Sequence, residues 1–273
     1  MGRASVVLLG TGSPRPAIDR AQPAQLLDTG TERFLVDCGD GVATQLLRVS
    51  FDPGDITKLF ITHLHWDHVL GYAPLVWGGW SMGRESLEIW GPPGTRRMHE
   101  LLFQDLFGRD VEWIQQYGYS RSAIESIRIH EVGEGRIYDR DGVQVDATRV
   151  CHPVITYAYR FTFGGTSVVF SGDTAECEAL VRCAHGADLL VQDACACRSR
   201  LYDDARSRAI QSALIGFHAS PQQAGRMAHR AGVRRLVCTH LLPGADEEDV
   251  LEEASSTYVG DVLVGRDLMR IDT

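Results

Sequence analysis

The sequence predicts an α/β protein in which two mixed β-sheets pack together and helices cover them, a four-layer αβ/βα sandwich. Strand-like and helix-like segments interleave along the 273 residues, but without the strict alternation that builds a single parallel sheet. No Pro-, Gly- or Ser-rich linker, low-complexity tract or block of like charge divides the chain. We therefore expect residues 1–273 to form one domain with an ample core.

Strands are expected where short β-branched or apolar runs are bounded by Gly, Asp or Pro. These runs are Ser5–Gly10, Ala24–Asp28, Arg33–Asp37, Lys58–Thr62, Leu87–Trp90, Ile124–Glu131, Val143–Arg149, Thr156–Phe163, Ser167–Ser171, Leu189–Asp193 and Leu236–His240. Helices are expected at Val42–Val49, Thr95–Phe107, Ala175–Ala184, Pro221–Ala231 and Glu247–Ala254. Ser220-Pro221-Gln222-Gln223 is a clear helix start, because it combines an N-cap serine, a proline at the first helical position and a glutamine that closes a capping box.

The residues most informative about function are 61–68, ITHLHWDH, which directly follow a short apolar run. If a strand ends there, His63 and His65 point the same way, because side chains two apart share a face. Asp67 and His68 then face a neighbouring point. Imidazole and carboxylate suit zinc and similar divalent ions, and two groups of ligands suggest two ions. A solvated polar loop is the alternative, but four candidate ligands in six positions disfavour it.

Three further candidate ligands follow other predicted strands. His152 comes after Val143–Arg149, Asp173 follows an apolar strand across a glycine, and His240 ends the last predicted strand. Chemistry tends to collect at such positions. Each residue alone would be interpreted as an ordinary loop histidine or turn residue.

The His-x-His-x-Asp-His string at 63–68 resembles the signature of the metallo-β-lactamase superfamily. Four other segments come in the order expected for that superfamily, so the resemblance covers nearly the whole chain. They are Leu8–Ser13, Asp37–Gly41, Ser171–Thr174 and Thr239-His240. The branch that the chain resembles is the ribonuclease Z-like group, which also includes arylsulfatase and phosphodiesterase relatives.

The resemblance implies a fold of this superfamily and seven protein ligands for two divalent ions, with zinc expected and manganese or iron as alternatives. By that resemblance one ion is held by His63, His65 and His152, and the other by Asp67, His68 and His240. Asp173 would bridge both ions together with a hydroxide. Asp67 would also orient that nucleophile, so the implied reaction is hydrolysis.

Four residues near these ligands have less certain roles. His218 resembles the ribonuclease Z histidine that assists the leaving group, although a backbone-bonded histidine at a helix entry is the alternative, and Ser220 departs mildly from the family pattern. Asp193 could orient His218. Asp37 and Asp40 either orient ligand imidazoles or simply form turns, and the sequence does not separate these possibilities.

Composition excludes or disfavours several other functions. The net charge of −9 disfavours a polyanionic substrate, since proteins that grip nucleic acid usually present a basic surface. Lys58 is the only lysine, which disfavours Schiff-base chemistry. Gly10-Thr11-Gly12 is no dinucleotide fingerprint, because Pro14 follows and no third glycine arrives. An iron redox protein on this scaffold would have lost ligands that are all present here.

The cysteines and the apolar segments indicate a reduced, cytoplasmic setting without membrane contact. Seven irregularly spaced cysteines give no disulfide framework. Cys195 and Cys197 are expected to be a buried reduced pair, and Cys151 receives no role. No run approaches a membrane span, and the N-terminal apolar stretch is too short for a secretion signal.

For the substrate, the sequence favours a small phosphodiester or an aryl sulfate ester. Ribonuclease Z proteins usually carry a long Gly/Pro-rich arm between the counterparts of His152 and Asp173, whereas only twenty residues separate them here. This spacing and the acidic charge place tRNA 3′ processing second, with a small-molecule ester preferred over RNA as the partner. Hydrolysis of a lactone or another carboxylic ester comes third.

Two segments are candidates for contacts with substrate or with a second copy of the chain. The first is an aromatic insert, residues 77–117. Its side chains, together with Trp66, could line an apolar pocket, or they could pack in the core and in a dimer interface. Its aromatic residues are Trp77, Trp80, Trp90, Phe103, Phe107, Trp113 and Tyr117. The second, Leu201–Phe217, could be a lid or an interface helix. The family resemblance implies a homodimer.

Overall fold

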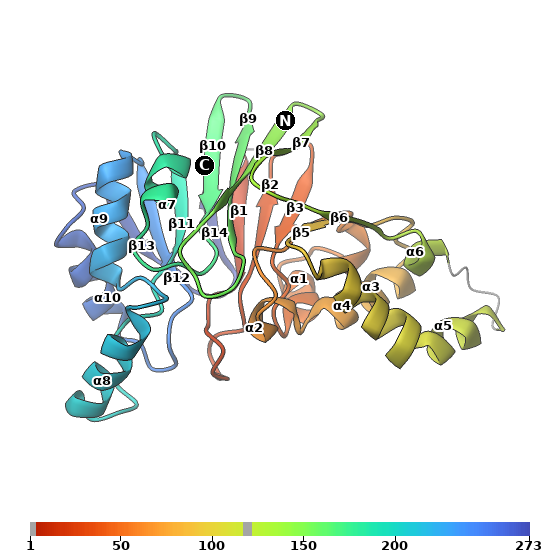
Figure 1. Ribbon diagram of the computed structural model, residues 1–273, viewed down its shortest axis with the longest axis horizontal. Coiled ribbons are helices and arrows are strands. Elements are labelled where there is room, and N and C mark those ends of the chain that lie inside the picture. Colours follow the sequence, from red (N-terminus) through yellow and green to blue (C-terminus); the bar gives the residue numbers. More distant parts are fainter. Residues whose placement is uncertain (1–3, 117–121) are drawn as a thin grey trace.

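The computed structural model describes residues 4–116 and 122–273 and has four layers, with two central sheets between two layers of helices (Figure 1). The first sheet has the strand order β14 (Met269–Asp272), β1 (Ser5–Gly10), β2 (Ala24–Asp28), β3 (Arg33–Val36), β4 (Lys58–Phe60), β5 (Glu88–Gly91) and β6 (Arg128–Glu131). The second has the order β13 (Asp261–Val264), β12 (Arg235–Thr239), β11 (Leu189–Asp193), β10 (Thr166–Phe170), β9 (Tyr157–Phe163), β8 (Val143–Arg149) and β7 (Gly135–Arg140). The predicted α/β sandwich is confirmed.

Helices are inserted between the strands along the chain. They are α1 (Val42–Arg48), α2 (Trp66–Val69), α3 (Tyr72–Ser81), α4 (Thr95–Glu100), α5 (Gly108–Gln115), α6 (Ser122–Glu125), α7 (Glu178–Cys183), α8 (Asp204–Leu214), α9 (Pro221–Ala231) and α10 (Glu247–Ser255). A short 3₁₀ helix covers Pro53–Asp55. Among the described residues, no helix has both the length and the apolar character needed to cross a bilayer.

Each sheet has an antiparallel half and a parallel half, and this places the candidate ligands. Strands β3 to β6 pair in parallel, as do β10 to β13. The carboxyl ends of parallel neighbours lie at the same edge of a sheet, where sites in α/β proteins usually form. The segments that follow β4, β10 and β12 carry His63, Asp173 and His240.

The two sheets pack through a core rich in aromatic side chains. Phe60 and Trp90 stack with ring centroids 4.7 Å apart, and Phe161 meets Phe60 edge-on at 5.2 Å. These residues come from both sheets, so the contact fixes β4 of the first sheet against β9 of the second. Aromatic pairs add to the burial of apolar area in holding such an interface.

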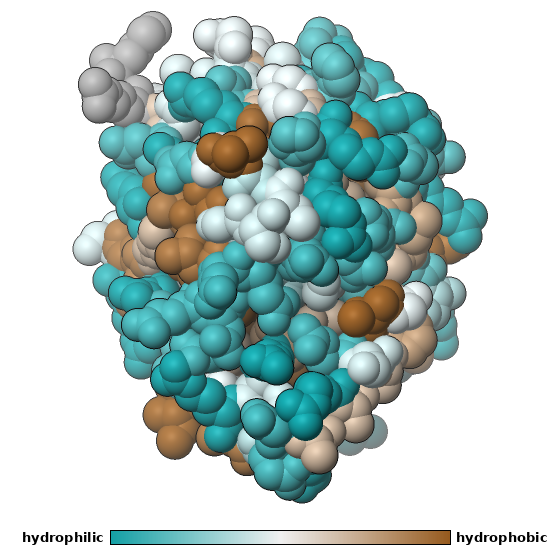
Figure 2. Space-filling model, turned by 90° about the vertical axis from the view of Figure 1, so that its left-hand side faces the viewer, coloured by the Kyte–Doolittle hydropathy of each residue, from teal (hydrophilic) through white to brown (hydrophobic). Residues whose placement is uncertain are grey.

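Helix α9 shows how the outer layers form. Ser220 accepts from the backbone of Gln223 and the Gln223 side chain accepts from the backbone of Ser220, so the predicted capping box is confirmed. Ala224, Met227 and Ala228 recur at helical spacing and are buried against the second sheet. Elsewhere the outer face formed by α8, α9 and α10 is mostly hydrophilic, with only separate small apolar groups (Figure 2).

Two predicted elements differ from the structure in type over part of their length, and others, such as α7, are shorter than predicted. The segment predicted as a strand from Ile124 to Glu131 is a strand only from Arg128 onward, because Ser122–Glu125 forms α6 and only β6 reaches β5 for parallel pairing. The helix predicted over Thr95–Phe107 is α-helical only to Glu100. It continues as a π-helix over Leu101–Leu106, where Phe107 N donates to Leu102 O.

Two glycines allow the turn after β3 to pack directly against the loop after β4. Cys38 N donates to His68 O and Gly71 N donates to Cys38 O, both at 2.9 Å. A Cβ atom on Gly39 would lie 2.4 Å from Asp67 O, and one on Gly71 would lie 2.2 Å from Gly39 O. No side chain fits at either position, so glycine is required for this close backbone approach.

We predict that Gly71→Ala destabilises the fold by about 1–3 kcal/mol, because the new methyl group must push apart two backbone segments. Gly133→Ala is the matched control, since a Cβ atom there meets nothing within 4 Å. Urea unfolding followed by circular dichroism measures both variants. Equal midpoints for Gly71→Ala and the wild type would contradict the packing described here.

Candidate metal centre

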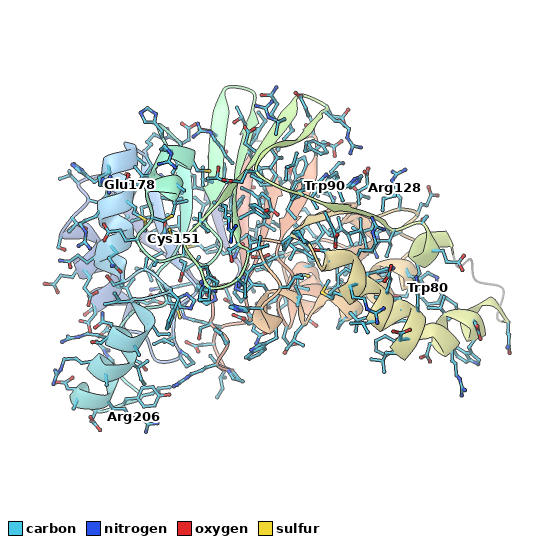
Figure 3. All side chains as sticks on the ribbon, viewed as in Figure 1. Trp80, Trp90, Arg128, Cys151, Glu178 and Arg206 are labelled. Atoms are coloured by element: carbon cyan, nitrogen blue, oxygen red, sulfur yellow. The ribbon has the colours of Figure 1, made fainter. Side chains whose placement is uncertain are left out.

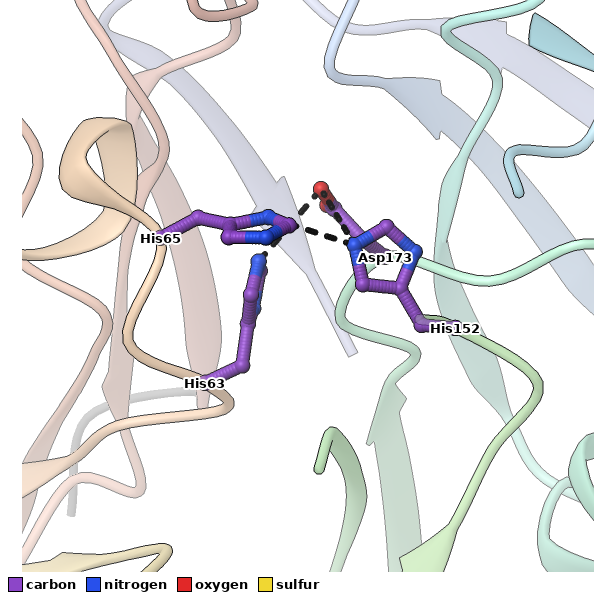
Figure 4. Close-up of side chains that lie close together, drawn as sticks. All are labelled: His63, His65, His152 and Asp173. Atoms are coloured by element: carbon purple, nitrogen blue, oxygen red, sulfur yellow. Dashed lines mark hydrogen bonds and ion pairs between the residues drawn. The ribbon is translucent and has the colours of Figure 1, made fainter. Parts of the chain in front are cut away.

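The structure brings all seven sequence-predicted ligands together at the edge where the two sheets meet. His63, His65, His152 and Asp173 form one group, shown in Figure 4. Asp67, His68 and His240 form a second group. Within each group, the ligand atoms all lie within 4.8 Å of one another. Residues up to 177 positions apart in the chain therefore converge on one small volume.

Asp173 lies between the two groups and turns one oxygen toward each. Its Oδ2 atom is 3.6 Å from His63 Nε2 and 3.9 Å from His152 Nε2. Its Oδ1 atom is 3.2 Å from His68 Nε2 and 3.4 Å from His240 Nε2. This is the arrangement that a carboxylate shared by two neighbouring ions requires.

The remaining distances within the groups are also short. His152 Nε2 is 3.3 Å from His65 Nδ1 in the first group. In the second, His240 Nε2 is 3.2 Å from Asp67 Oδ2. His63 Nε2 is buried and has no hydrogen-bond partner among the described residues. A buried imidazole nitrogen without a partner, facing a carboxylate, is placed as a metal ligand would be, so the donor set suits divalent ions.

The electrostatics of the cluster also call for positive charge. Burial alone would lower the pKa of His68, but the carboxylates of Asp173 and Asp37 outweigh it and raise that pKa to about 10. Burial is likewise outweighed at His240, whose pKa Asp173 raises well above its usual value. Burial would raise the pKa of Asp173, but the surrounding histidines His240, His68 and His63 hold it well below its usual range. Protonated histidines thus balance the charge of the buried carboxylates. Bound divalent ions would supply the same positive charge.

Asp37 orients two residues of the loop 61–68. Of the two roles that the sequence left open for Asp37, this is the orienting one. Its carboxylate accepts from His68 Nδ1 at 2.8 Å and from Thr62 N and Oγ1 at 2.7 and 2.8 Å. The bond to Nδ1 directs the opposite ring nitrogen of His68 toward Asp173. Asp40, by contrast, is exposed and belongs to the turn.

The backbone at the site adopts conformations that side chains usually avoid. Asp37 and His240 have φ angles of 58° and 61°. Gly172, just before Asp173, has φ 58°, and a Cβ atom there would lie 3.0 Å from both Thr62 and Thr156. Such conformations persist only where the surrounding structure enforces them, and they cluster at functional sites.

His218 and Asp193 are hydrogen-bonded beside the metal centre, as the sequence suggested. His218 Nδ1 lies 2.9 Å from Asp193 Oδ2 and 3.8 Å from Asp173 Oδ2. Asp193 is itself held in place, because it accepts from the backbone nitrogens of Thr174 and Cys195 at 3.1 and 2.8 Å. The pKa of His218 is raised above its usual value, since Asp193 outweighs the opposing effect of burial.

Sequence reasoning missed two contacts that position the ligands. Thr62 Oγ1 lies 3.0 Å from His63 Nδ1 and links that ring to Asp37. The Phe217 carbonyl accepts from His152 Nδ1 at 2.9 Å. The only sequence signal for either is adjacency, since Thr62 precedes His63 and Phe217 precedes His218.

The aromatic insert does not line the metal centre. Trp90 and Phe103 are buried in the cores. Trp77, Trp80, Phe107 and Trp113 instead line a separate surface pocket together with Asp110 and Ile114, and no candidate ligand borders it. Trp66 is 48% exposed beside the ligands, and Tyr117 lies outside the described residues.

Comparisons with known proteins agree with this geometry. Residues 32–241 match the family model described as the β-lactamase superfamily domain. The chain is 34% identical over 276 residues to a curated ribonuclease Z of Mycobacterium marinum, covering 98% of both chains. The chain belongs to the metallo-β-lactamase superfamily, in its ribonuclease Z-like branch. It is therefore a hydrolase of that superfamily, and the predicted resemblance is confirmed.

Solved structures support the same fold assignment for this superfamily member. The metallo-β-lactamase fold protein YhfI of Bacillus subtilis superposes with a TM-score of 0.75 and 22% identity over the full length of both chains. Human tRNase Z, short form, superposes with a TM-score of 0.72 and 26% identity, with 98% of each chain covered. The fold of the superfamily generally holds two metal ions, which fits the two groups of ligands described above.

We predict that Asp37→Asn weakens metal binding by about 10–100-fold, because a neutral amide accepts a weaker hydrogen bond from His68 Nδ1 and orients that ring less firmly. Titration against a fluorescent zinc chelator measures the affinity. Asp40→Asn, an exposed change in the same turn, should bind like the wild type. Unchanged affinity in Asp37→Asn would remove Asp37 from the orienting role.

Proposed function

We propose that the protein is a metal-dependent RNA hydrolase that cleaves a phosphodiester bond during 3′ processing of precursor tRNA. The observation that carries this proposal is the end-to-end match to curated ribonuclease Z proteins, at 34% identity over 98% of both chains for the M. marinum protein. A complete set of candidate ligands in this chain accompanies that match. This reverses the ranking favoured by the sequence alone, in which a small ester came first.

The short connection between His152 and Asp173 does not argue against this proposal. Strands β9 and β10 are joined there by Gly164 and Gly165 alone, so the long arm expected of ribonuclease Z is absent. The M. marinum relative nevertheless aligns over only 276 positions while 98% of each chain is covered. That alignment leaves no room for a long arm in the relative either.

Arginines are exposed near α8 despite the net charge of −9. Arg206 lies at the start of this helix, which projects from the same edge of the sandwich as α2 (Figures 1 and 3). Arg200 precedes the helix and pairs with Asp246, and Arg208 pairs with Asp204. Arg15 donates to Tyr202 Oη, and the Arg206 guanidinium lies over the Tyr202 ring. Exposed arginines near an aromatic ring suit contacts with phosphates and bases.

The residues of the candidate centre have different roles in the proposed reaction. We infer that His63, His65 and His152 hold one ion, that Asp67, His68 and His240 hold the other, and that Asp173 is shared. Five imidazoles and two carboxylates favour zinc. When bound, such ions lower the pKa of water toward neutrality and neutralise charge on a phosphoryl group. We also assign Asp67 the role of orienting the attacking water. We infer that the centre belongs to a single domain that spans residues 1–273.

His218 is the candidate for delivering a proton to the departing oxygen. Asp193 accepts from Nδ1 and so directs the opposite ring nitrogen away from itself. Asp193 also favours the protonated ring, which is the form that a proton donor needs. The ring is 3.8 Å from Asp173 and hence borders the centre.

A small phosphodiester remains the second candidate substrate. The acidic net charge favours it, because an acidic protein repels a large polyanion more strongly than a small ester. Both candidates use the same bond type and the same seven ligands. Only a direct comparison of substrates separates them.

We predict that the zinc-loaded protein cleaves a 3′-extended precursor tRNA far more efficiently than bis(p-nitrophenyl) phosphate, p-nitrophenyl sulfate or a lactone. Asp173→Asn should lose at least about 100-fold in rate, because the carboxylate between the two groups loses its charge. His185→Ala removes an exposed histidine outside the centre and should keep full activity. Initial rates are measured by gel for the precursor tRNA, by nitrophenol absorbance for the two nitrophenyl substrates, and by acid release for the lactone. Rapid diester hydrolysis with an intact precursor would favour the second candidate.

We predict that the effect of His218→Ala depends on the leaving group. For RNA, whose departing oxygen needs a proton, kcat should fall by roughly 10²–10⁴-fold. For a p-nitrophenyl ester, whose leaving group departs as a stable anion, the loss should be less than about tenfold. Equal losses on both substrates would show that His218 supports the centre without donating a proton.

A further inference from the structure

Cys151 and Cys177 lie unusually close together, although neither took part in the proposed function. Their Sγ atoms are 2.7 Å apart, and both residues are free cysteines. Non-bonded heavy atoms are normally separated by about 3.5 Å or more. A disulfide needs about 2.0 Å between the sulfurs. A movement of well under 1 Å would thus join the two side chains.

The backbone already holds the two cysteine segments together. Cys151 N donates to Thr174 Oγ1 at 3.2 Å, and Ala175 N donates to Cys151 O at 2.9 Å. Cys177 is the residue at the start of α7 and is buried. Figure 3 shows Cys151 close to α7. The backbone at Cys151 is therefore held next to the segment that leads into α7, and the side chains alone have to rotate for the two sulfurs to meet.

The two thiols differ in their access to solvent. Cys151 is exposed, whereas Cys177 is 4% exposed. The other five cysteines are all buried. An oxidant in solution can reach Cys151 first, and Cys177 is then the thiol within reach to complete a bond.

We propose that Cys151 and Cys177 form a reversible disulfide that clamps the segment carrying His152 to the segment carrying Asp173. The formation of the bond does not depend on the proposed activity. Its effect on bound metal does rest on the proposed assignment of His152 and Asp173 as ligands.

The oxidant is a low-molecular-weight disulfide, R–S–S–R. The Cys151 thiolate attacks one of its sulfurs, so a Cys151–S–S–R bond forms and one R–S⁻ leaves. The Cys177 thiolate then attacks Cys151 Sγ, which forms the internal disulfide and releases the second R–S⁻. The two cysteine protons end on the two released thiolates, so R–S–S–R is reduced to two R–SH while two cysteines are oxidised.

The bond would act on the metal centre through its nearest ligand segments. Cys151 is adjacent to His152, and Cys177 follows Asp173 by four residues. We expect an ion to leave more readily when these segments open locally. A covalent link between them restrains that opening, so the oxidised protein should unfold at a higher temperature and lose its metal more slowly.

The experiment treats the purified full-length protein with oxidised glutathione and maps its disulfides by peptide mass spectrometry. We expect one linked peptide pair containing Cys151 and Cys177, and a fall in titratable thiols from the seven of the sequence to five. The Tm should rise by about 5 °C. Zinc transfer to a chelator should slow by about threefold or more, and dithiothreitol should reverse each change.

Variants distinguish this pair from general oxidation. Cys151→Ser and Cys177→Ala should each abolish the linked peptide and both shifts, whereas Cys183→Ala, on α7, should behave like the wild type. A missing linked peptide in both metal-free and zinc-loaded wild-type protein would overturn the proposal. A bond that forms without slowing zinc transfer would overturn the clamp. The peptide map needs no catalysis, so failure of the tRNA assay leaves this test independent.

Discussion

The structure depends on bringing loops from two different sheets to one point, and two hydrogen bonds across the sheet interface do this directly. Tyr157 N donates to Thr62 O at 3.0 Å, and Tyr159 Oη donates to Ile61 O at 2.7 Å. Both donors belong to β9 of the second sheet, whereas both acceptors precede His63 in the first. The first ligand loop is therefore fixed by the opposite half of the molecule, and the aromatic contacts of Phe60 hold the same junction.

This constraint explains why a buried cluster of charge is tolerated. Burying carboxylates such as Asp67 and Asp173 is costly unless each has a partner of opposite charge. Asp67 is hydrogen-bonded by His240, and the histidines around Asp173 come from the segments after β4, β8 and β12. The cluster therefore forms only when the whole sandwich is assembled. The left-handed backbone at Asp37 and His240 is consistent with this, because residues with a side chain avoid that conformation unless the surrounding structure enforces it.

Elements of the fold and the site were predictable from the sequence where the residues that determine them are close together in the chain. The capping box at Ser220 is confirmed because its chemistry lies within four residues, and the ligand motif at 63–68 is recognisable from spacing alone. Elements whose stability comes from distant partners were missed. The strand β14 pairs with β1 from the other end of the chain, and α3 contains Pro74 and two glycines that weaken a helical pattern. The pairing of Cys151 with Cys177 has no sequence signature, whereas the expected pair at Cys195 and Cys197 was suggested merely by proximity in sequence.

The choice of substrate depends on residues outside the ligand set. Two groups of candidate ligands around a shared carboxylate suit metal-assisted hydrolysis, but they do not discriminate between a small ester and RNA. Discrimination must come from elements that border the centre and differ between relatives. In this chain the candidate is the projecting α8 with its exposed arginines, because the β9–β10 hairpin turns at Gly164 and Gly165, at the end of β10 away from Asp173. Under the proposed function, we expect the contacts that select RNA to include the junction where the loop after β1 meets the segment before α8 through Arg15 and Tyr202.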